Sequence, residues 1–491
     1  MLNKKIFFSI LFMLLVFVFI SSEAQQSSFP VHIILLGKVQ EHGGKGIAGV
    51  AVTDGINVVR TDRKGAYILE STNEAAFVYI SLPSGYEVPT NGGIAEFYRK
   101  IESHHGVFKA DFYLKKMARS DLRHYTILWA DPQINNMEQA GQLHSTAVPD
   151  AKILATELLK SGPVLGIAAG DIAWDAAPII PEYKKAVKET GIPFFQVLGN
   201  HDMNVNVRSD ECSDSSFSEN FGPSWYSFNR GEAHYVILDN VFYYSNGYNY
   251  IGYLTERQLK WLEQDLASVK PGSLVFVSMH ISGYTEEKRR NRLKTDNPGN
   301  VTFNRRFLFD MLKPFKAHLL TGHTHYNENR TEAGVYEHIH GAVCAAWWTI
   351  PICDDGTPAG YGVYEVNGTN VKWYYKSIGF GREYQMRTYN RGAYPKKPAD
   401  IAVNVWNWDK EWKVVWYEDG ILKGPMRQEV DFDADAVRLM SGGGKPEKYS
   451  WIEPRLTDHL FFATPDASAR KVSVEATDRF GSKYKEEILL K

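Results

Sequence analysis

Cysteine is nearly absent from this chain: only 3 occur among its 491 residues. So few thiols exclude a disulfide framework, and any metal site would have to come from His, Asp and Asn. An excess of charge of one sign is also missing, because 55 Lys and Arg stand against 57 Asp and Glu, for a formal net charge of −2. Non-specific binding to nucleic acid needs a basic field, so we expect no nucleic-acid partner.

Long hydrophobic runs are absent after the N-terminus, where none approaches the about 20 residues that a membrane-spanning helix needs. The one long run, Ile6 to Ile20, follows Lys4 and Lys5 and precedes Ser-Ser-Glu-Ala-Gln. This pattern is typical of a secretory signal peptide over residues 1–24, cleaved after Ala24. The alternative is an uncleaved N-terminal anchor. We therefore expect a protein exported to the periplasm or the extracellular space, without a transmembrane segment once the signal is removed.

The chain has enough apolar residues to form several hydrophobic cores, since 44% of its residues are hydrophobic and 13% are aromatic. At about 150 residues per domain, its length corresponds to roughly three domains. Residues 27–117 show short strand-like runs between turn clusters, which predicts a small β-sandwich. Residues 118–360 alternate strands with helical patterns, as in an α/β domain. Residues 361–491 return to strands, beginning with VKWYYKSIG, and predict a second β-sandwich.

The first of these segments carries the pattern GKV…GIAGVAVTDG…RTDRKGAYIL. This pattern resembles the carboxypeptidase-regulatory or transthyretin-like β-sandwich modules that are attached to exported enzymes. The segment contains no cluster of titratable side chains. We therefore interpret it as a structural or docking module.

Polar side chains follow five apolar strands of the central segment, at the point where each strand ends. In chain order these stretches are Asp131-Pro132-Gln133, Gly170-Asp171, Gly199-Asn200-His201-Asp202, His280 and Gly322-His323-Thr324-His325. In an α/β domain the strand ends gather at one rim of the sheets, so these side chains should converge. Carboxylates, amides and imidazoles in one place suit a pair of divalent ions, which can clamp the oxygens of a phosphoryl displacement.

The ordered set D-x-Q, G-D, G-N-H-D, H and G-H-x-H resembles the calcineurin-like metallophosphoesterase superfamily. The stretches FGPSWYSFNRGEAHYVILDN and WW…DGTPAGY resemble its exported subgroup, which has β-domains on both sides of the catalytic core. The resemblance implies an α/β core made of a two-sheet sandwich flanked by helices, with an all-β sandwich domain on each side. It also implies a metal-dependent hydrolase of phosphate monoesters or diesters.

The resemblance also assigns roles to individual residues. The implied ligands of the first metal ion are Asp131, Gln133, Asp171 and His325, and those of the second are Asp171, Asn200, His280 and His323. Asp171 would bridge two ions, and a hydroxide between the ions would be the nucleophile. His201 would protonate the leaving alkoxide or fix a phosphate oxygen, with Asp202 as the candidate that orients its imidazole. Asp175 is a further loop acid that either supports the site or is a plain loop residue.

Gln133 departs from the pattern, since many relatives carry histidine at this position. An amide oxygen is a harder and weaker ligand than an imidazole nitrogen, which favours Mn²⁺, Mg²⁺ or Fe over Zn²⁺. Two ligand carboxylates and a bridging hydroxide leave a pair of dications with a net positive charge. The cofactors are therefore expected to be two divalent ions (Mn, Fe, Mg or Zn), and the substrate to be anionic.

Two groups of residues are candidates for substrate contacts. Trp347, Trp348 and Tyr361 border the glycine-rich segment after G-H-T-H and would line the mouth of the pocket, with core packing as the equal alternative. Arg289 and Arg290 belong to a basic run after His280 that would receive a second anionic group, with a solvated loop as the default interpretation. Cys344 and Cys353 lie close enough in sequence to pair, and the sequence leaves their state open.

These observations favour an exported dimetal phosphoesterase that acts on a small-molecule, lipid or glycan phosphate ester. The alternative is a surface binding protein that retains an inactive phosphoesterase core. Several tryptophans in the C-terminal segment motivate this alternative: Trp406, Trp408, Trp412 and Trp416. The unbroken series of ligand motifs weighs against it.

Overall fold

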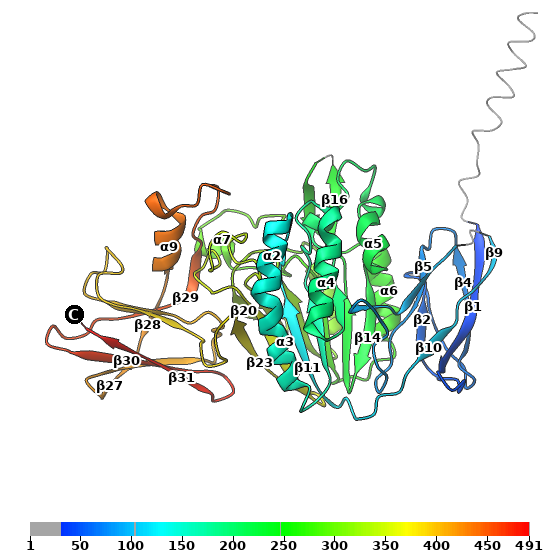
Figure 1. Cartoon of the computed structure of the whole chain (residues 1–491), viewed down its shortest axis with the longest axis horizontal. Coiled ribbons are helices and arrows are strands. Elements are labelled where there is room, and N and C mark those ends of the chain that lie inside the picture. The colour runs from blue at the N-terminus through cyan, green and yellow to red at the C-terminus, as the bar shows by residue number, and fades with distance from the viewer. Residues whose placement is uncertain (1–30, 103–104, 246, 491) are drawn as a thin grey trace, which may run out of the picture.

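The computed structural model describes residues 31–102, 105–245 and 247–490, which form three parts in a row (Figure 1). The predicted signal peptide lies outside these residues. The N-terminal part lies at one end, the α/β core in the middle and the C-terminal part at the other end. None of the helices within the described ranges has both the length and the apolar character needed to cross a membrane.

The N-terminal part contains two small β-sheets. Its strands are β1 (His32–Glu41), β2 (Ala51–Thr53), β3 (Val58–Arg60), β4 (Ala66–Thr72), β5 (Phe77–Ile80), β8 (Tyr98–Lys100), β9 (Gly106–Lys109) and β10 (Phe112–Leu114). One sheet has the order β10-β1-β4, with β9 also paired to β1, and the other has the order β3-β2-β5-β8. Buried side chains alternate with more exposed ones along β1, as expected for strands with one face on a core.

The core contains two larger sheets, the first of which has the order β23-β22-β11-β12-β13-β7-β6. Its strands are β6 (Thr90–Asn91), β7 (Ile94–Ala95), β11 (Arg123–Trp129), β12 (Val164–Ala168), β13 (Phe194–Gln196), β22 (Gly360–Asn367) and β23 (Asn370–Ser377). The three central strands β11, β12 and β13 are parallel, so their carboxyl ends lie at the same edge. The β6-β7 hairpin is contributed by the N-terminal segment.

The second core sheet has the order β14-β15-β18-β19-β21-β20. Its strands are β14 (Tyr226–Arg230), β15 (Ala233–Ile237), β18 (Leu274–Ser278), β19 (Lys316–Thr321), β20 (Glu328–Glu332) and β21 (Val335–Ile339). The inner strands β15, β18, β19 and β21 run parallel. A separate hairpin of β16 (Val241–Ser245) and β17 (Asn249–Gly252) follows β15.

The core segment contains several helices, and the longer ones cover the outer faces of the two core sheets. The helices of this segment are α2 (Met137–Ser145), α3 (Ala147–Leu158), α4 (Ile180–Thr190), α5 (Ser215–Phe221), α6 (Glu256–Leu266), α7 (Glu287–Arg290) and α8 (Arg305–Leu312). α2, α3 and α4 share a hydrophobic cluster with Trp129 and Phe194 of the first sheet. α6 and α8 share another with Val236 and Val277 of the second sheet. Parallel strands that are covered on both faces consist of continuous apolar runs. This explains why every residue of β12 and β18 is buried.

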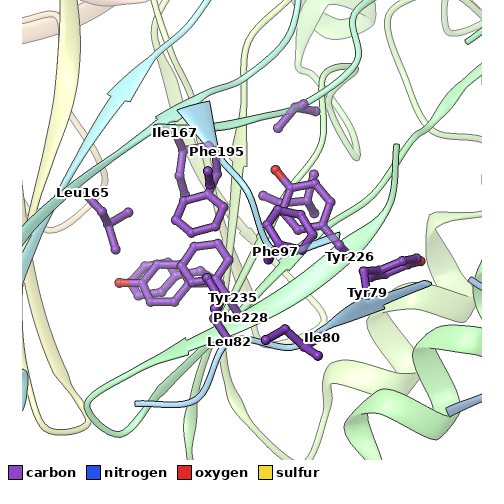
Figure 2. Packing of buried hydrophobic residues seen from close by; sticks show 14 of the residues in the cluster. Tyr79, Ile80, Leu82, Phe97, Leu165, Ile167, Phe195, Tyr226, Phe228 and Tyr235 are labelled. Atoms are coloured by element: carbon purple, nitrogen blue, oxygen red, sulfur yellow. The ribbon is translucent and has the colours of Figure 1, made fainter. Parts of the chain in front are cut away.

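Aromatic rings fill the space between the two core sheets (Figure 2). Phe195 of the first sheet stacks on Phe228 of the second at 3.8 Å between ring centroids. Tyr235 stacks on the other side of this pair, 4.7 Å from Phe228. The same cluster includes Ile80 and Leu82 of the N-terminal part, so that part shares a core with the α/β sandwich. The predicted fold class, a two-sheet core flanked by helices with β-rich parts on both sides, is confirmed.

The C-terminal part is a sandwich of two four-stranded sheets, β24-β25-β29-β28 and β27-β26-β30-β31. Its elements are β24 (Arg387–Tyr389), β25 (Ile401–Asn404), β26 (Lys413–Glu418), β27 (Ile421–Pro425), β28 (Arg427–Phe432), α9 (Ala434–Met440), β29 (Leu456–Ala463), β30 (Lys471–Thr477) and β31 (Lys483–Leu489). Val403, Trp416 and Val474 lie in the hydrophobic cluster that both sheets share.

The predicted domain boundary at residue 360 needs correction. β22 pairs antiparallel with β11, and β23 pairs with β22, so this hairpin extends the first core sheet. The segment VKWYYKSIG, which was expected in the C-terminal sandwich, is therefore part of the core. Strand periodicity reports which side chains are buried but not which sheet the strand joins, so the sequence pattern does not separate the two cases.

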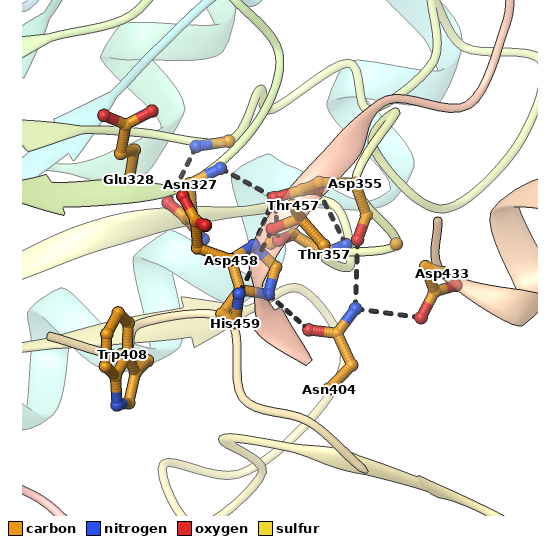
Figure 3. A network of polar contacts seen from close by, with 12 residues as sticks. Asn327, Glu328, Asp355, Thr357, Asn404, Trp408, Asp433, Thr457, Asp458 and His459 are labelled. Atoms are coloured by element: carbon orange, nitrogen blue, oxygen red, sulfur yellow. Dashed lines mark hydrogen bonds and ion pairs between the residues drawn. The ribbon is translucent and has the colours of Figure 1, made fainter. Parts of the chain in front are cut away.

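A buried polar network joins the core to the C-terminal part (Figure 3). The ring of His459 lies between Asp355 Oδ2, at 2.9 Å from Nε2, and Asn404 Oδ1, at 2.6 Å from Nδ1. Asp355 Oδ2 also accepts a hydrogen bond from the backbone N–H of Asn327 at 2.8 Å. Asn404 Nδ2 donates to Asp433 Oδ2 at 2.9 Å. The C-terminal part is thus fixed to the core segment that directly follows the G-H-T-H motif.

Arg289 and Arg290 belong to the same interface and not to an anion site. The guanidinium of Arg290 is buried and contacts Glu328 at 2.6 Å and Asp458 at 3.4 Å. Arg289 contacts Glu286 at 2.9 Å and Asp458 at 2.5 Å. Both side chains are therefore committed to carboxylates, which corrects the prediction that they receive a substrate group.

Replacing Arg290 with Met is expected to lower the free energy of unfolding by about 3–5 kcal/mol, because it leaves the buried carboxylate of Glu328 without its partner. Urea denaturation followed by circular dichroism measures this loss. Arg289→Met is the matched control, since its side chain is 53% exposed and surface pairs contribute about 1 kcal/mol or less. Equal losses in the two variants would contradict the assignment of Arg290 as the structural member of the pair.

Candidate metal centre

The loops after β11, β12, β13, β18 and β19 bring the predicted ligands together at the carboxyl ends of the strands. All of the predicted ligands are buried except His323, which is half-buried. Because each loop starts where a buried strand ends, its first polar residues face the rim of the sheets and not the core between them. The expected convergence therefore appears in the structure.

Three other predicted ligands surround the imidazole of His280. Its Nε2 atom lies 3.2 Å from Asp171 Oδ1, 3.0 Å from Asn200 Oδ1 and 3.1 Å from His323 Nδ1. Asp171, His280 and His323 each offer a ligand atom within 4.8 Å of the others. Together with Asn200, these residues are the ones that the resemblance assigns to the second metal ion.

The remaining three predicted ligands adjoin this group. His325 Nε2 lies 3.6 Å from Asp131 Oδ1. Both carboxylate oxygens of Asp131 accept from the backbone N–H of His323, at 3.2 and 3.0 Å. Gln133 Nε2 donates to Asp171 Oδ2 at 3.3 Å. A half-turn of this amide would exchange its nitrogen for its oxygen, which is the atom that a cation requires.

The hydrogen bonds of the histidines test whether the group fits cations. His280 Nδ1 lies 2.8 Å from the carbonyl of Ala169, and His325 Nδ1 lies 3.0 Å from the carbonyl of Ala345. In each neutral ring Nδ1 then carries the proton, and the lone pair of Nε2 faces an acidic oxygen. Facing lone pairs repel unless a proton or a cation lies between them, and a backbone carbonyl on the other ring nitrogen is the usual support for a metal-ligating histidine. The residues therefore fit divalent ions.

The pKa values of these groups reflect the short distances between their carboxylates and imidazoles. Burial alone would raise the pKa of Asp171, but the positive charges of His280 and His201 outweigh burial and lower it. Burial alone would lower the pKa of His280, but the charge of Asp171 outweighs it and raises the pKa to about 9. Burial, together with the charge of His280, lowers the pKa of His323 to about 3. The carboxylates thus stabilise a positive charge beside Asp171, and either a proton on His280 or a bound cation supplies that charge.

The backbone at the centre is strained. The non-glycine residues Asp131, Gln133, Asp171, His323 and His325 have φ angles of 50°, 44°, 49°, 72° and 53°. Each lies in the left-handed region, which costs most residues of order 1 kcal/mol and which clusters at functional sites. The loops therefore hold these side chains in directions that an ordinary turn would not give.

Gly199 shows how closely the loops approach one another. A Cβ atom at this position would lie 2.0 Å from the backbone nitrogen of Asp171. No side chain fits there, because the loops after β12 and β13 are in direct backbone contact. The glycine is therefore required for Asp171 and Asn200 to reach the same centre.

His201 lies beside the predicted ligands and has a carboxylate partner. Its backbone N–H donates to Asp171 Oδ1 at 2.9 Å, and its ring Nδ1 lies 2.8 Å from Asp175 Oδ1. Burial alone would lower the pKa of His201, but the charge of Asp171 and the hydrogen bond and charge of Asp175 outweigh burial and raise it. A protonated imidazole is therefore favoured next to the centre.

The predicted role of Asp202 is corrected by this geometry. Its carboxylate accepts hydrogen bonds from the backbone N–H groups of Ile172, at 3.0 Å, Ala173, at 3.0 Å, and Gly199, at 2.9 Å. Burial and the charge of Asp171 raise the pKa of Asp202 to about 7. Asp202 therefore ties the loops after β12 and β13 together, and Asp175 is the residue that orients the ring of His201.

The three predicted aromatic contacts have different positions. Trp347 stacks on the ring of His325 at 4.2 Å between centroids, with 19° between the planes. Trp348 Nε1 donates to the carbonyl of Pro132 at 3.0 Å, within the first ligand loop. Tyr361 is fully buried on β22, and its hydroxyl contacts Asp150 Oδ1 at 2.5 Å. Tyr361 is thus a core residue, and the prediction that it lines the pocket mouth is wrong.

Two residues at the centre were not anticipated. Asn300 Oδ1 lies 3.2 Å from His323 Nε2, and no strand end or motif marks this asparagine in the sequence. Cys344 Sγ lies 3.7 Å from Gln133 Oε1 and 3.9 Å from His325 Nδ1. All three cysteines are free thiols, so Cys344 does not pair with Cys353.

Comparison with known families accounts for this arrangement. Three family models match successive segments: the N terminal of calcineurin-like phosphoesterase over residues 34–117, calcineurin-like phosphoesterase over 141–327, and the C terminal of calcineurin-like phosphoesterase over 337–484. The chain therefore belongs to the calcineurin-like phosphoesterases that carry both flanking domains, which confirms the resemblance of its motifs.

Solved structures resemble the chain at low sequence identity. A dimetal phosphatase from Danio rerio is 14% identical, with a TM-score of 0.36, over 52% of this chain and 97% of that one. A purple acid phosphatase from yellow lupin (Lupinus luteus) seeds is 13% identical, with a TM-score of 0.37, over 67% of each chain. No curated protein matches the chain.

Proposed function

We propose that this chain is an exported dimetal phosphoesterase that hydrolyses phosphate esters. The observation that supports it most is the set of facing acceptor atoms around Asp171, His280 and His325, which cations would reconcile. Two divalent ions bound by these loops would activate water as the nucleophile and neutralise negative charge on the phosphate. The ligand oxygen of Gln133 favours Mn²⁺, Mg²⁺ or Fe over Zn²⁺ at the first position.

The chain's own residues would handle the leaving group. Asp175 holds Nδ1 of His201, so the opposite nitrogen, Nε2, is the one that can reach a substrate. The raised pKa of His201 favours the protonated ring, whose Nε2–H would be given to the departing oxygen. Asp202 keeps the backbone of both loops in place while this transfer occurs.

Export is part of the proposal and rests on the N-terminal sequence alone. A basic start, the apolar run to Ile20 and the small residues before Ala24 support a cleaved signal. The substrate would then be an exported or extracellular phosphate ester, such as a small-molecule, lipid or glycan ester. The fold itself does not select among them, because function lies in the site.

The experiment that tests this function uses the purified full chain loaded with Mn²⁺. We expect it to hydrolyse p-nitrophenyl phosphate or bis-p-nitrophenyl phosphate, to lose this activity on chelation, and to regain it when Mn²⁺ is restored. Parallel assays with Mg²⁺, Fe²⁺ and Zn²⁺ rank the metals. Failure to cleave either ester with any of the four metals would refute the proposal.

A further inference from the structure

An arc of aromatic rings runs around one side of the candidate metal centre. It begins on His325, where Trp347 stacks at 4.2 Å. Trp451 meets Trp347 edge to face at 4.4 Å, and Trp174 meets Trp451 edge to face at 6.2 Å. The arc ends on His201, whose ring centroid is 5.9 Å from that of Trp174. Aromatic contacts thus connect a predicted metal ligand with the predicted proton donor.

The C-terminal part contributes directly to this arc. Trp451 and Tyr449 lie in the segment between α9 and β29, far from the core residues in sequence. Tyr449 packs on Trp174 at 4.9 Å, and its hydroxyl accepts a hydrogen bond from Gln139 Nε2 at 3.1 Å. The segment is therefore seated on the core beside the centre by specific contacts.

Part of the aromatic surface stays open to solvent. The side chain of Trp451 is 52% exposed, although it contacts two other tryptophans. Tyr248 is also 52% exposed, and its ring centroid lies 6.4 Å from that of His201. If packing were the only role of these rings, we would expect them to be covered. Exposed aromatic faces beside a site are instead typical of binding surfaces.

We propose that this aromatic arc binds the leaving group of the substrate and that this leaving group carries a flat aromatic ring. The inference rests on the proposed phosphoesterase function. The proposed function places the departing oxygen on the His201 side of the centre, and the ring centroids of Trp174 and Tyr248 lie 5.9 and 6.4 Å from that of His201. A flat ring there can lie against Trp451 and Tyr248, gaining stacking or edge-to-face contact that an alkyl group cannot match.

Binding of two phosphonates to the Mn²⁺-loaded full chain tests this inference. Phenylphosphonate and methylphosphonate share the same anionic group, neither is a phosphate ester, and they differ in the aromatic ring. Calorimetry should show that the wild-type chain binds phenylphosphonate about tenfold more tightly. Trp451→Ala should reduce this preference to about twofold or less, and Trp451→Phe should keep an intermediate preference.

Tyr244→Ala is the matched control. Tyr244 is 58% exposed on the same hairpin as Tyr248, but within the described part of the chain it makes no contact with His201. It should keep the wild-type preference. Equal binding of the two phosphonates by the wild type, or an unchanged preference in Trp451→Ala, would overturn the inference while leaving the phosphoesterase function standing. Binding of neither phosphonate would remove the anion site itself, and both proposals would fall.

Aryl esters and nucleotides both present a flat ring, and kinetics separates the two sources. Phenyl phosphate is compared with methyl phosphate, and adenosine 5′-monophosphate with ribose 5-phosphate. For each pair, the kcat/KM of the substrate with the ring is divided by that of the substrate without it. The pair for which this ratio falls at least about fivefold in Trp451→Ala shows how far from phosphorus the bound ring lies. If neither ratio changes, the inference is wrong.

Discussion

Replacing Asp171 with Asn is expected to reduce kcat by about 10⁴-fold or more and to remove bound metal. The change keeps the shape of the side chain but removes the charge that faces His280, at 3.2 Å, and that the family resemblance assigns to both ions. A bound ion stabilises the transition state of phosphoryl transfer by several kcal/mol, and about 1.4 kcal/mol corresponds to a factor of ten. Steady-state kinetics and elemental analysis of the same preparation measure the two effects.

Asp310→Asn is the matched control for this substitution, because Asp310 lies on α8 with a side chain that is 46% exposed. It should leave both the rate and the metal content unchanged. Asp171→Asn activity within tenfold of the wild type, with full metal content, would show that this carboxylate does not hold the ions together.

The second large effect is expected for His201→Gln, which should lower kcat by about 10²–10⁴-fold, as for the loss of a general acid. Its side chain is not among the predicted ligands, so the metal content should remain unchanged. The loss should be larger for an alkyl ester than for a p-nitrophenyl ester, since the p-nitrophenolate ion leaves without a proton. Equal losses for the two esters would contradict the role of proton donor.

The pH dependence gives an independent readout of the same residue. The raised pKa of His201 means that the acid is protonated below that pKa and that activity falls as the pH rises through it. Asp175 contributes to the raised pKa, so Asp175→Asn should lower the pKa of His201 and move the alkaline limb to lower pH. An unmoved limb in Asp175→Asn would show that Asp175 does not act on His201.

The sequence predicted that these polar residues would converge because their signal is local. Each lies a few residues after an apolar strand, and the carboxyl ends of neighbouring parallel strands meet at one edge whatever the rest of the fold does. The structure brings Asp131, Asp171, His280, His323 and His325 together as this rule requires. The need for Gly199 could also be predicted, since a strand that turns sharply into a ligand loop requires a glycine.

Other features depend on contacts that local pattern does not encode. Asp175 and Asp202 are both loop acids near His201, and only the fold directs one to the imidazole and the other to backbone N–H groups. The basic run at Arg289 looks solvated in sequence, yet Arg290 contacts Asp458 from the C-terminal sandwich, 168 residues further along the chain. Tyr449 contacts Gln139, which lies 310 residues away in the sequence. The aromatic arc therefore could not be predicted from local sequence patterns.

The central claim, that the converging loops hold a pair of divalent ions, is tested most directly by the metal content of the wild-type chain. The full chain is loaded with Mn²⁺, freed of unbound ions by gel filtration and analysed by mass spectrometry for its elements. About two ions should remain bound to each chain. A chain that retains no metal after this loading would rule out the pair of ions and would favour a binding protein with an inactive phosphoesterase core.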